Sequence, residues 1–353
     1  MLITEKILAV FVFWAAGSGL FFYVLNRWVL MLKDYRAKTP LLLLALALLY
    51  GGGAWWGWRA GFSPYFWCAL ALLVVLVISE LRRLRLRRTL AGAPPVWQEN
   101  VAEPLLQPFT TTTLAIRHYE IRTPHWRGPR LRIAHVTDLH VNDMLPDSHY
   151  RLVMERVKQT EPDLLFYTGD FVCEKFECAD RLPSLLGDVH GRLGTFAILG
   201  NHDLWADVPR LMTGLRAAGI QTLANGFQTL ETAGGRLALW GCEDPWGPTP
   251  WTPPPRRDDE LVLALSHTGD NIYRLARAGA DAVFSGHYHA GQWRLPVIGP
   301  LMVPSRFGRR FDHGHFVVNG AHLFASAGIG LTRIPFRLYC RPDFFVVDVL
   351  SGE

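Results

Sequence analysis

Cysteine is scarce in this 353-residue chain, and its spacing is irregular. The five cysteines are Cys68, Cys173, Cys178, Cys242 and Cys340. Small secreted scaffolds that depend on disulfides carry many closely spaced cysteines, so the composition excludes that class of protein. We expect these thiols to be reduced and partly buried.

Charged residues are missing from three stretches in the first quarter of the chain. The stretches cover residues 7–25, 41–58 and 62–79, and each is 18 or 19 residues long. A helix needs roughly 20 apolar residues to cross a bilayer, so the pattern predicts three membrane-spanning helices. A secretory signal is the alternative for the first stretch, although no small-residue cleavage site follows it. A two-helix arrangement also stays open, because glycines at 51–53 interrupt the second stretch.

Basic residues alternate between the segments that flank these stretches. Residues 26–40 contain four basic side chains, residues 59–61 contain one, and residues 80–90 contain five. Positively charged loops stay in the cytoplasm, so the pattern predicts a multi-pass protein of the cell (inner) membrane. In this topology the amino terminus lies outside and the large carboxyl-terminal part lies in the cytoplasm.

The formal net charge of +5 is concentrated beside the uncharged stretches. This placement favours anionic membrane lipids as partners. No segment combines basic and aromatic residues in the manner of a nucleic-acid-binding motif, so we expect no nucleic-acid partner.

The rest of the chain alternates short apolar runs with amphipathic segments and contains no internal repeat. Residues 91–110 are rich in proline and predict a linker. The predicted strands cover residues 111–121, 131–136, 164–167, 195–199, 261–265 and 282–284. The predicted helices cover residues 150–160, 208–218 and 271–278, and hairpins are expected at 228–240 and 316–325. Residues 245–255, rich in proline and tryptophan, predict a surface loop. This alternation is typical of an α/β fold.

Aspartate, asparagine and histidine recur at the ends of five predicted strands. These residues are Asp138, His140, Asp170, Asn201, His202, His267, His287 and His289. In open α/β sheets, sites form at the carboxyl ends of strands, so we expect these side chains at one rim. A lone histidine or aspartate at a strand end is more often structural, but an ordered set favours metal binding. Carboxylate and imidazole ligands suit zinc, manganese or iron, and seven candidate ligands exceed the needs of one ion.

The five blocks resemble the signature of the calcineurin-like metallophosphoesterases, which reads D-x-H, G-D, G-N-H-D/E, H and G-H-x-H. The resemblance extends from about residue 129 to the end of the chain. It implies a four-layer α/β/β/α sandwich, preceded here by an α-helical transmembrane region. The domains would then be residues 1–90, with about three helices and a basic juxtamembrane segment, 91–110 as the linker, and 111–353 as the phosphoesterase domain.

The resemblance also implies a role for each block. Asp138, His140 and His289 would hold the first metal, Asn201, His267 and His287 would hold the second, and Asp170 would bridge them. His202 would not ligate but would lie over the substrate phosphate, as the catalytic residue, with Asp203 as a candidate orienting partner. Two divalent ions (manganese, iron or zinc) about 3.5–4 Å apart can share a hydroxide that attacks a phosphoester.

Two later segments, residues 286–300 and 328–342, resemble the membrane-associated branch of bacterial-type phosphodiesterases. That branch includes relatives of UDP-diacylglucosamine hydrolases. We therefore expect a phosphodiesterase whose substrate is lipid-linked or a nucleotide-lipid. The basic and aromatic residues 306–311 would either grip its headgroup or form an ordinary exposed loop. A phosphomonoesterase acting on phosphoproteins or nucleotides is the alternative, followed by a non-catalytic membrane scaffold.

Overall fold

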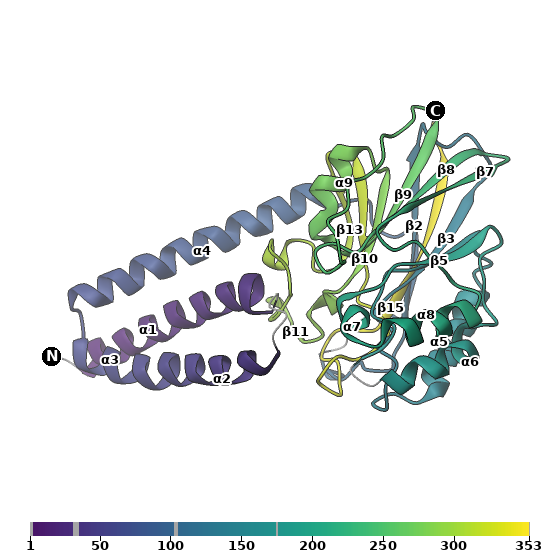
Figure 1. Ribbon diagram of the computed structural model, residues 1–353. Coiled ribbons are helices and arrows are strands. Elements are labelled where there is room, and N and C mark those ends of the chain that lie inside the picture. Colours follow the sequence, from purple (N-terminus) through teal and green to yellow (C-terminus); the bar gives the residue numbers. More distant parts are fainter. Residues whose placement is uncertain (1–2, 31–34, 102–104, 174–175, 353) are drawn as a thin grey trace. The chain divides into compact units, whose positions relative to one another are not determined.

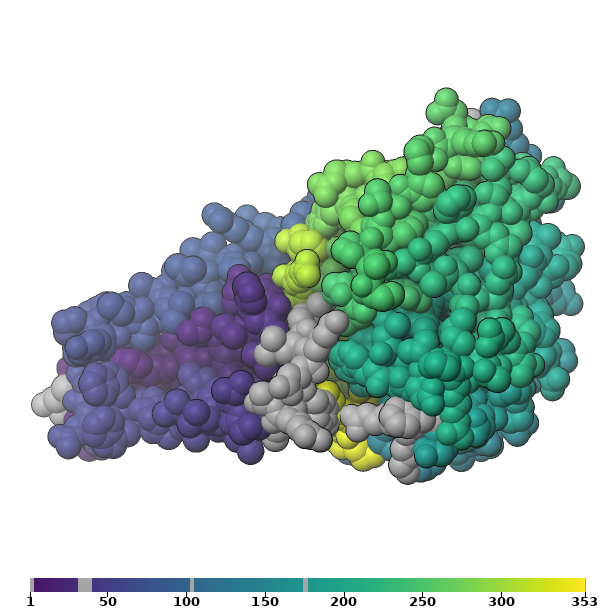
Figure 2. Space-filling model, in the orientation of Figure 1, coloured from purple at the N-terminus to yellow at the C-terminus, as the bar shows by residue number. Residues whose placement is uncertain are grey.

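The computed structural model describes residues 3–30, 35–101, 105–173 and 176–352, which divide into two compact units (Figure 1). The helical unit contains Met1–Thr89 and Met302–Arg310, and the α/β unit contains Leu90–Leu301 and Phe311–Glu353. Figure 2 shows the surface of the helical unit mainly in purple and blue and that of the α/β unit mainly in teal and green. Each unit is described separately below.

Three helical segments of the helical unit are long and apolar enough to cross a membrane. They are Ile3–Val29, Pro40–Ala60 and Pro64–Leu90, with mean hydropathies of 2.1, 1.5 and 2.0. The glycines at 51–53, which left a two-helix arrangement open, do not split the second segment. Its backbone stays helical through a π-helical turn, Ala47–Gly52, which joins α2 (Tyr35–Leu46) to α3 (Gly53–Ala60). Three helices of spanning length are therefore confirmed. Residues 31–34, within the basic segment used for the topology prediction, lie outside the described residues.

Helix α1 (Ile3–Val24) approaches α3 closely, and a small residue makes the approach possible. A Cβ atom added at Gly57 would lie 2.8 Å from the Cα atom of Val10. Small residues at such crossings let helix backbones pack without a hydrophobic driving force, as they do in membranes. Ala9, Val12 and Phe66 form a buried cluster that also links α1 to α4 (Pro64–Leu90).

Two mixed β-sheets form the α/β unit. The first has the order β1-β2-β15-β3-β4-β5-β6 and the second the order β13-β14-β10-β9-β8-β7. The strands of the first sheet are β1 (Trp97–Glu99), β2 (Ala115–Thr123), β15 (Asp343–Ser351), β3 (Leu131–Val136), β4 (Leu164–Tyr167), β5 (Gly194–Ala197) and β6 (Gln221–Thr222). Those of the second are β13 (Gly314–Val318), β14 (Ala321–Ala325), β10 (Ala282–Gly286), β9 (Glu260–Thr268), β8 (Gly235–Cys242) and β7 (Phe227–Thr232). The strands β3 to β6 run parallel, as do β8, β9, β10 and β14.

One hydrophobic core lies between the two sheets. Ile133, Phe166 and Phe345 of the first sheet belong to the same buried cluster as Leu263 and Phe284 of the second. These strands are apolar on both faces because their other faces are covered as well, which explains why they read as continuous hydrophobic runs.

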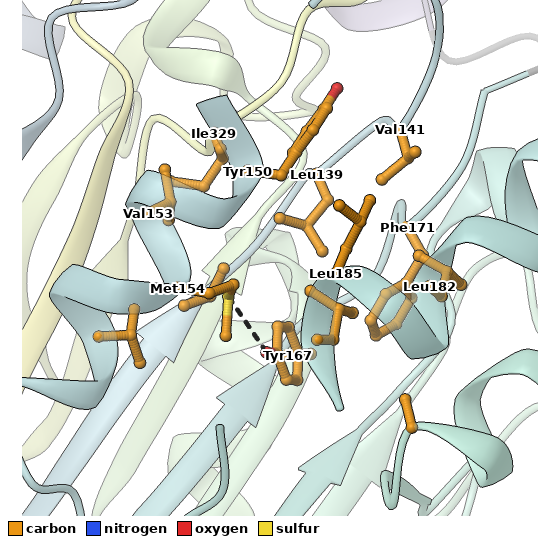
Figure 3. Close-up of a cluster of buried hydrophobic side chains, with 14 of the residues drawn as sticks. Leu139, Val141, Tyr150, Val153, Met154, Tyr167, Phe171, Leu182, Leu185 and Ile329 are labelled. Carbon is orange, nitrogen blue, oxygen red and sulfur yellow. Dashed lines mark hydrogen bonds between the residues drawn. The ribbon is translucent and has the colours of Figure 1, made fainter. Parts of the chain in front are cut away.

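A second core lies between the first sheet and three helices, α5 (Asp147–Lys158), α6 (Leu182–Leu186) and α8 (Val208–Ala217). Figure 3 shows side chains of α5 and α6 gathered around Tyr167 of β4, whose hydroxyl donates to the Met154 sulfur at 3.6 Å. The mixed α/β fold predicted from the sequence is confirmed. The four-layer arrangement stays a prediction.

Several predicted elements differ from the observed ones in their bounds. The segment 91–110, expected to be a linker, contains the edge strand β1, which pairs antiparallel with β2. The strand expected from residue 111 begins only at Ala115, because residues 111 and 112 form a turn. Pairing between segments far apart in the chain decides both points, and local sequence does not report it.

Candidate metal centre

The predicted site residues lie where central strands of the two sheets end. In the first sheet, Asp138 and His140 follow β3, Asp170 follows β4, and Asn201 and His202 follow β5. In the second sheet, His267 is the penultimate residue of β9, and His287 and His289 follow β10. The loops after β3 and β4 continue the pairing of their strands, since the His140 N–H donates to the Asp170 carbonyl at 2.9 Å. This pairing fixes the first two loops relative to each other.

Alternation along the chain explains how the first loop holds its ligand-type side chains. Leu139 and Val141 point into the core beneath the sheet, as Figure 3 shows. Asp138 and His140, on either side of Leu139, are instead completely buried among polar groups of the site. Leu139 and Val141 thus anchor this loop in the core, while Asp138 and His140 lie at the rim.

The backbone at the site is strained. Five of the seven predicted ligands have a positive φ, namely Asp138 (50°), His140 (41°), Asp170 (56°), His287 (67°) and His289 (49°). Such conformations are uncommon for residues other than glycine, and they gather at functional sites where the surrounding structure enforces them. Glycine is required beside them, because a Cβ atom on Gly200 or Gly286 would overlap the carboxylate of Asp170 or Asp138.

The first group of donor atoms belongs to Asp138, His140 and His289. Their ligand atoms lie within 4.8 Å of one another, and all three residues are buried. The Nε2 atoms of His140 and His289 are 3.0 Å apart, and the latter lies 3.2 Å from Asp138 Oδ1.

The second group belongs to Asp170, His267 and His287, again within 4.8 Å of one another. His267 Nε2 lies 3.2 Å from Asp170 Oδ2 and 3.2 Å from Asn201 Oδ1. Asp170 Oδ2 is also 3.4 Å from His140 Nε2 of the first group. The Asp170 carboxylate therefore reaches both groups, as a bridging ligand must.

The arrangement fits divalent cations. Two imidazole nitrogens 3.0 Å apart can share one proton in a hydrogen bond, and two ligands about 2.1 Å from one cation also lie at about this separation. His287 Nε2 is buried and has no hydrogen-bond partner among the described residues. Buried polar atoms without a partner are rare and call for an explanation, which a metal ion supplies. Two clusters of this chain could thus bind two metal ions.

Further contacts orient the histidine rings. His267 Nδ1 lies 2.6 Å from the Thr168 carbonyl, and this contact assigns the proton to Nδ1 and turns Nε2 toward the carboxylate. His140 Nδ1 lies 3.1 Å from the Cys173 sulfur. Asp138 is held by the backbone N–H of His287, which approaches Asp138 Oδ2 to 3.0 Å.

Burial and charge shift the pKa values of the site in opposite directions. Burial would raise the pKa of Asp170, but His267 and His202 hold it well below its usual range. Burial lowers the pKa of His287, and the neighbouring His267 adds to this effect. Carboxylates that are ionised and imidazoles that are neutral are the forms that bind metals.

His202 is partly exposed, unlike the buried groups around it. Its ring packs edge-on against His140, with centroids 4.9 Å apart, and its backbone N–H donates to Asp170 Oδ1 at 2.8 Å. Burial lowers the pKa of His202, partly offset by Asp170, and the positive charge of Arg333 lowers it further. The ring therefore lies beside the first group of ligands with one side open.

Among the described residues, Asp203 does not make the predicted hydrogen bond to the ring of His202. Its carboxylate instead accepts the backbone N–H groups of Gly200 at 3.0 Å and Val172 at 3.1 Å. Burial, together with the charge of Asp170, raises the pKa of Asp203. Asp203 thus ties the loop after β5 to the loop after β4, which is a structural role.

Several neighbours of the site escaped the sequence analysis, among them Cys173, Trp246 and Arg333. The Trp246 ring lies 4.6 Å from that of His287, and the side chain is only 7% exposed, although residues 245–255 were expected to form a surface loop. The richness of that segment in tryptophan was the available signal, since large rings seldom stay in solvent. The sequence around Cys173 and Arg333 contains no comparable signal that these residues lie near the site.

Comparisons with known proteins agree with the geometry. Residues 131–291 match the model of the calcineurin-like phosphoesterases. UDP-2,3-diacylglucosamine pyrophosphatase LpxG of Chlamydia muridarum is 34% identical over 252 residues, which cover 56% of this chain and 77% of LpxG. Phosphodiesterase YaeI of Escherichia coli is 28% identical (62% of this chain, 82% of YaeI), and the uncharacterized metallophosphoesterase YkuE of Bacillus subtilis is 27% identical (62% and 79%). The chain belongs to the calcineurin-like metallophosphoesterases, hydrolases that act on ester bonds.

Proposed function

We propose that this protein is a membrane-anchored, two-metal phosphodiesterase. The observation that supports it most directly is the pair of buried donor groups, Asp138, His140 and His289 on one side and Asp170, His267 and His287 on the other. The carboxylate of Asp170 lies within 3.4 Å of a histidine from each group. A site for one ion would need only one of these groups.

The first metal would be held by Asp138, His140 and His289. The second would be held by Asn201, His267 and His287, with Asp170 between the two. When bound, such a pair of divalent cations supplies a nucleophile at neutral pH and neutralises charge on the phosphate oxygens.

His202 is the group of the chain that would meet the substrate. Its contact with Asp170 Oδ1 through the backbone fixes the residue, and the partly exposed ring stays beside the first donor group. An imidazole N–H at this position can donate a hydrogen bond to a phosphate or leaving-group oxygen and stabilise the charge that develops there.

A diester is the proposed substrate class, and a lipid-linked phosphate is the proposed form. The support comes from two relatives, a phosphodiesterase and a pyrophosphatase named for a diacylated sugar nucleotide. Three helices of spanning length would hold the enzyme at a membrane, where such substrates are found. The alternation of basic segments supports placement of the α/β unit in the cytoplasm.

The test of the catalytic assignment uses the full chain purified in detergent and loaded with manganese. We expect His202→Ala to hydrolyse a chromogenic phosphodiester about 10²-fold more slowly than the wild type. His190→Ala, which changes an exposed histidine outside the site, is the control and should keep full activity. Equal rates for His202→Ala and wild type would remove His202 from the mechanism. Faster hydrolysis of a monoester than of the diester would favour the phosphomonoesterase alternative.

The membrane topology has its own test. A reporter that is active only outside the cytoplasm, fused to the carboxyl terminus, should stay inactive in intact cells. Activity of that reporter would contradict the proposed orientation while leaving the metal centre untouched.

A further inference from the structure

A cavity of about 630 Å³ lies within the helical unit, between the carboxyl-terminal part of the first spanning segment, the last turns of α4 and the segment Met302–Arg310. We call it the arginine pocket. Five arginines line it: Arg27, Arg82, Arg83, Arg306 and Arg310. Apolar side chains of α4 complete its wall, and the described lining contains no acidic residue.

One face of α4 supplies the helical wall of the pocket. Val75, Ile78, Ser79, Arg82, Arg83 and Leu86 line it, and their spacing of three and four residues places them on the same side of the helix. Along this face the apolar Val75 and Ile78 precede the cationic Arg82 and Arg83, and Leu86 follows them. A membrane lipid has the same order, with acyl chains followed by a phosphate.

The opposite wall is anchored by a buried asparagine in a π-helical turn, Leu25–Val29. Asn26 is only 4% exposed, its side-chain oxygen accepts the N–H of Val303 at 2.7 Å, and its carbonyl accepts the N–H of Ser305 at 3.2 Å. Burying an amide is unfavourable unless it is hydrogen-bonded, so these contacts hold the segment that carries Arg306 and Arg310 in place. Turns of π-helix are frequent at functional sites.

Among the described residues, Glu80 pairs with one arginine of the pocket lining. Glu80 accepts hydrogen bonds from Arg83 at 2.6 and 2.9 Å and pairs with Arg309, which lies outside the lining. Five guanidinium groups around one cavity repel one another, and a bound anion would offset this repulsion. Guanidinium groups match phosphate in particular, because two parallel N–H groups can donate to two of its oxygens.

Aromatic rings orient two of these guanidinium groups. Arg27 lies over the ring of Tyr23 at 3.9 Å from its centroid, and Arg310 lies over that of Phe307 at 5.0 Å. Such cation–π contacts restrict the side chains before any ligand arrives, and this lowers the entropy lost on binding. The pocket is therefore preorganised.

We propose that the arginine pocket binds the phosphate of an anionic membrane lipid, with the acyl chains along Val75 and Ile78. The proposal concerns a site in the helical unit and does not rest on the proposed phosphodiesterase activity. In this proposal, Arg306 and Arg310 bind lipid phosphate and take no part in the metal centre.

The test measures lipid binding by the full chain with native mass spectrometry after exchange into mixed micelles. We expect phosphatidylglycerol to stay bound to the wild type in preference to phosphatidylcholine. Arg82→Gln/Arg306→Gln, which changes two exposed arginines of the pocket, should weaken phosphatidylglycerol binding about tenfold, the effect of losing roughly one charge-assisted hydrogen bond. Arg85→Gln/Arg88→Gln removes the same charge from exposed positions of α4 outside the pocket and should bind like the wild type.

Three outcomes would overturn the proposal. Equal losses in both double variants would mean that the basic surface attracts lipid without a defined site. Equal retention of the two lipids by the wild type would show that the pocket does not select lipids by net negative charge, which contradicts an anionic ligand. Displacement of phosphatidylglycerol by millimolar inorganic phosphate would identify a soluble anion as the ligand. Should the pocket double variant fold poorly, Arg82→Gln compared with Arg85→Gln asks the same question with single changes.

Discussion

Two kinds of buried aspartate occur in the α/β unit, and they differ in how the protein compensates their charge. Asp343, at the start of β15, pairs with Arg117 and accepts hydrogen bonds from His313 at 2.6 Å, Ser326 at 2.8 Å and the Ala327 N–H at 2.7 Å. Asp138 and Asp170 lie equally deep, but their side-chain neighbours are mostly histidines whose Nε2 atoms crowd together.

This difference distinguishes the cluster around Asp343, which is structural, from the candidate metal centre around Asp138 and Asp170. Around Asp343 the cationic groups belong to the protein, so the cluster is complete in the folded chain. At the metal centre, described donor atoms face one another at 3.0–3.4 Å and His287 Nε2 has no partner. The same residue types therefore occur in two settings, and the buried nitrogen without a described partner marks the cluster that could bind cations.

The largest expected effect is on catalysis. Asp170→Asn removes the carboxylate that reaches both donor groups, so we expect diester hydrolysis to fall by about 10³-fold or more. Metal content should fall with it. Steady-state rates and metal analysis of the same preparation measure both quantities, and a variant that keeps two ions and wild-type activity would contradict the role of Asp170.

Asp343→Asn should have the opposite profile. The substitution removes the negative charge that pairs with Arg117 and replaces one acceptor oxygen by an NH2 donor, which we expect to lower the free energy of unfolding by about 3 kcal/mol. Metal content per folded molecule should stay at the wild-type value. Denaturant unfolding in detergent checks the first point, and loss of metal without loss of stability would erase the distinction between the two clusters.

Chelation should destabilise the wild type by a moderate amount. Ligands that bind only the folded state stabilise it by about 2.7 kcal/mol at a hundredfold excess over Kd, so removing the metals should lower the thermal midpoint by roughly 5–10 °C. Asp170→Asn should show a clearly smaller shift. Thermal unfolding with and without chelator makes the comparison, and equal shifts in the two proteins would place the stabilising ions elsewhere.

Acid should weaken the structural cluster around Asp343. Burial alone would raise the pKa of Asp343, but His313 and Arg117 hold it below its usual range. A carboxyl group whose pKa is lower in the folded state stabilises fully above its unfolded pKa, about 3.9, and loses this contribution as the pH falls toward the folded value. We expect the chelated wild type to lose stability below about pH 4 more steeply than chelated Asp343→Asn. Parallel pH profiles would contradict this assignment.

The smallest effect is expected at Cys173, whose sulfur lies 3.1 Å from His140 Nδ1. Contacts behind a ligand change metal affinity by about 10–100-fold, and a weak sulfur contact belongs at the low end of that range. Cys173→Ala should thus raise the metal Kd by about tenfold. Cys178→Ala, in the hydrophobic core, should leave the Kd unchanged, and equal affinities in both variants would show that the His140 contact is incidental.

The sequence permits the prediction of ligand-type residues better than of their surroundings. Asp138, Asp170 and His287 follow short apolar runs, so local pattern alone places them at strand ends, and the structure does bring these ends together. Trp246 and Cys173 approach the site from other loops, and the packing that brings them there involves residues distant in the chain. The adjacency of Asp203 and His202 in sequence was misleading, because neighbouring side chains in a short helix point in different directions.

The helical unit shows the same limit. The lengths of its three apolar segments follow directly from the missing charges, and the glycines at 51–53 do not interrupt the helix. Met302–Arg310 contacts this unit through the buried side chain of Asn26 and through the pair Glu80–Arg309, contacts that no periodicity or composition reveals.

Elemental analysis of purified, active protein tests the central claim most directly. The account predicts two divalent ions per chain in material that hydrolyses the diester, and one or none in inactive Asp170→Asn. Active wild-type protein that contains a single ion would contradict it.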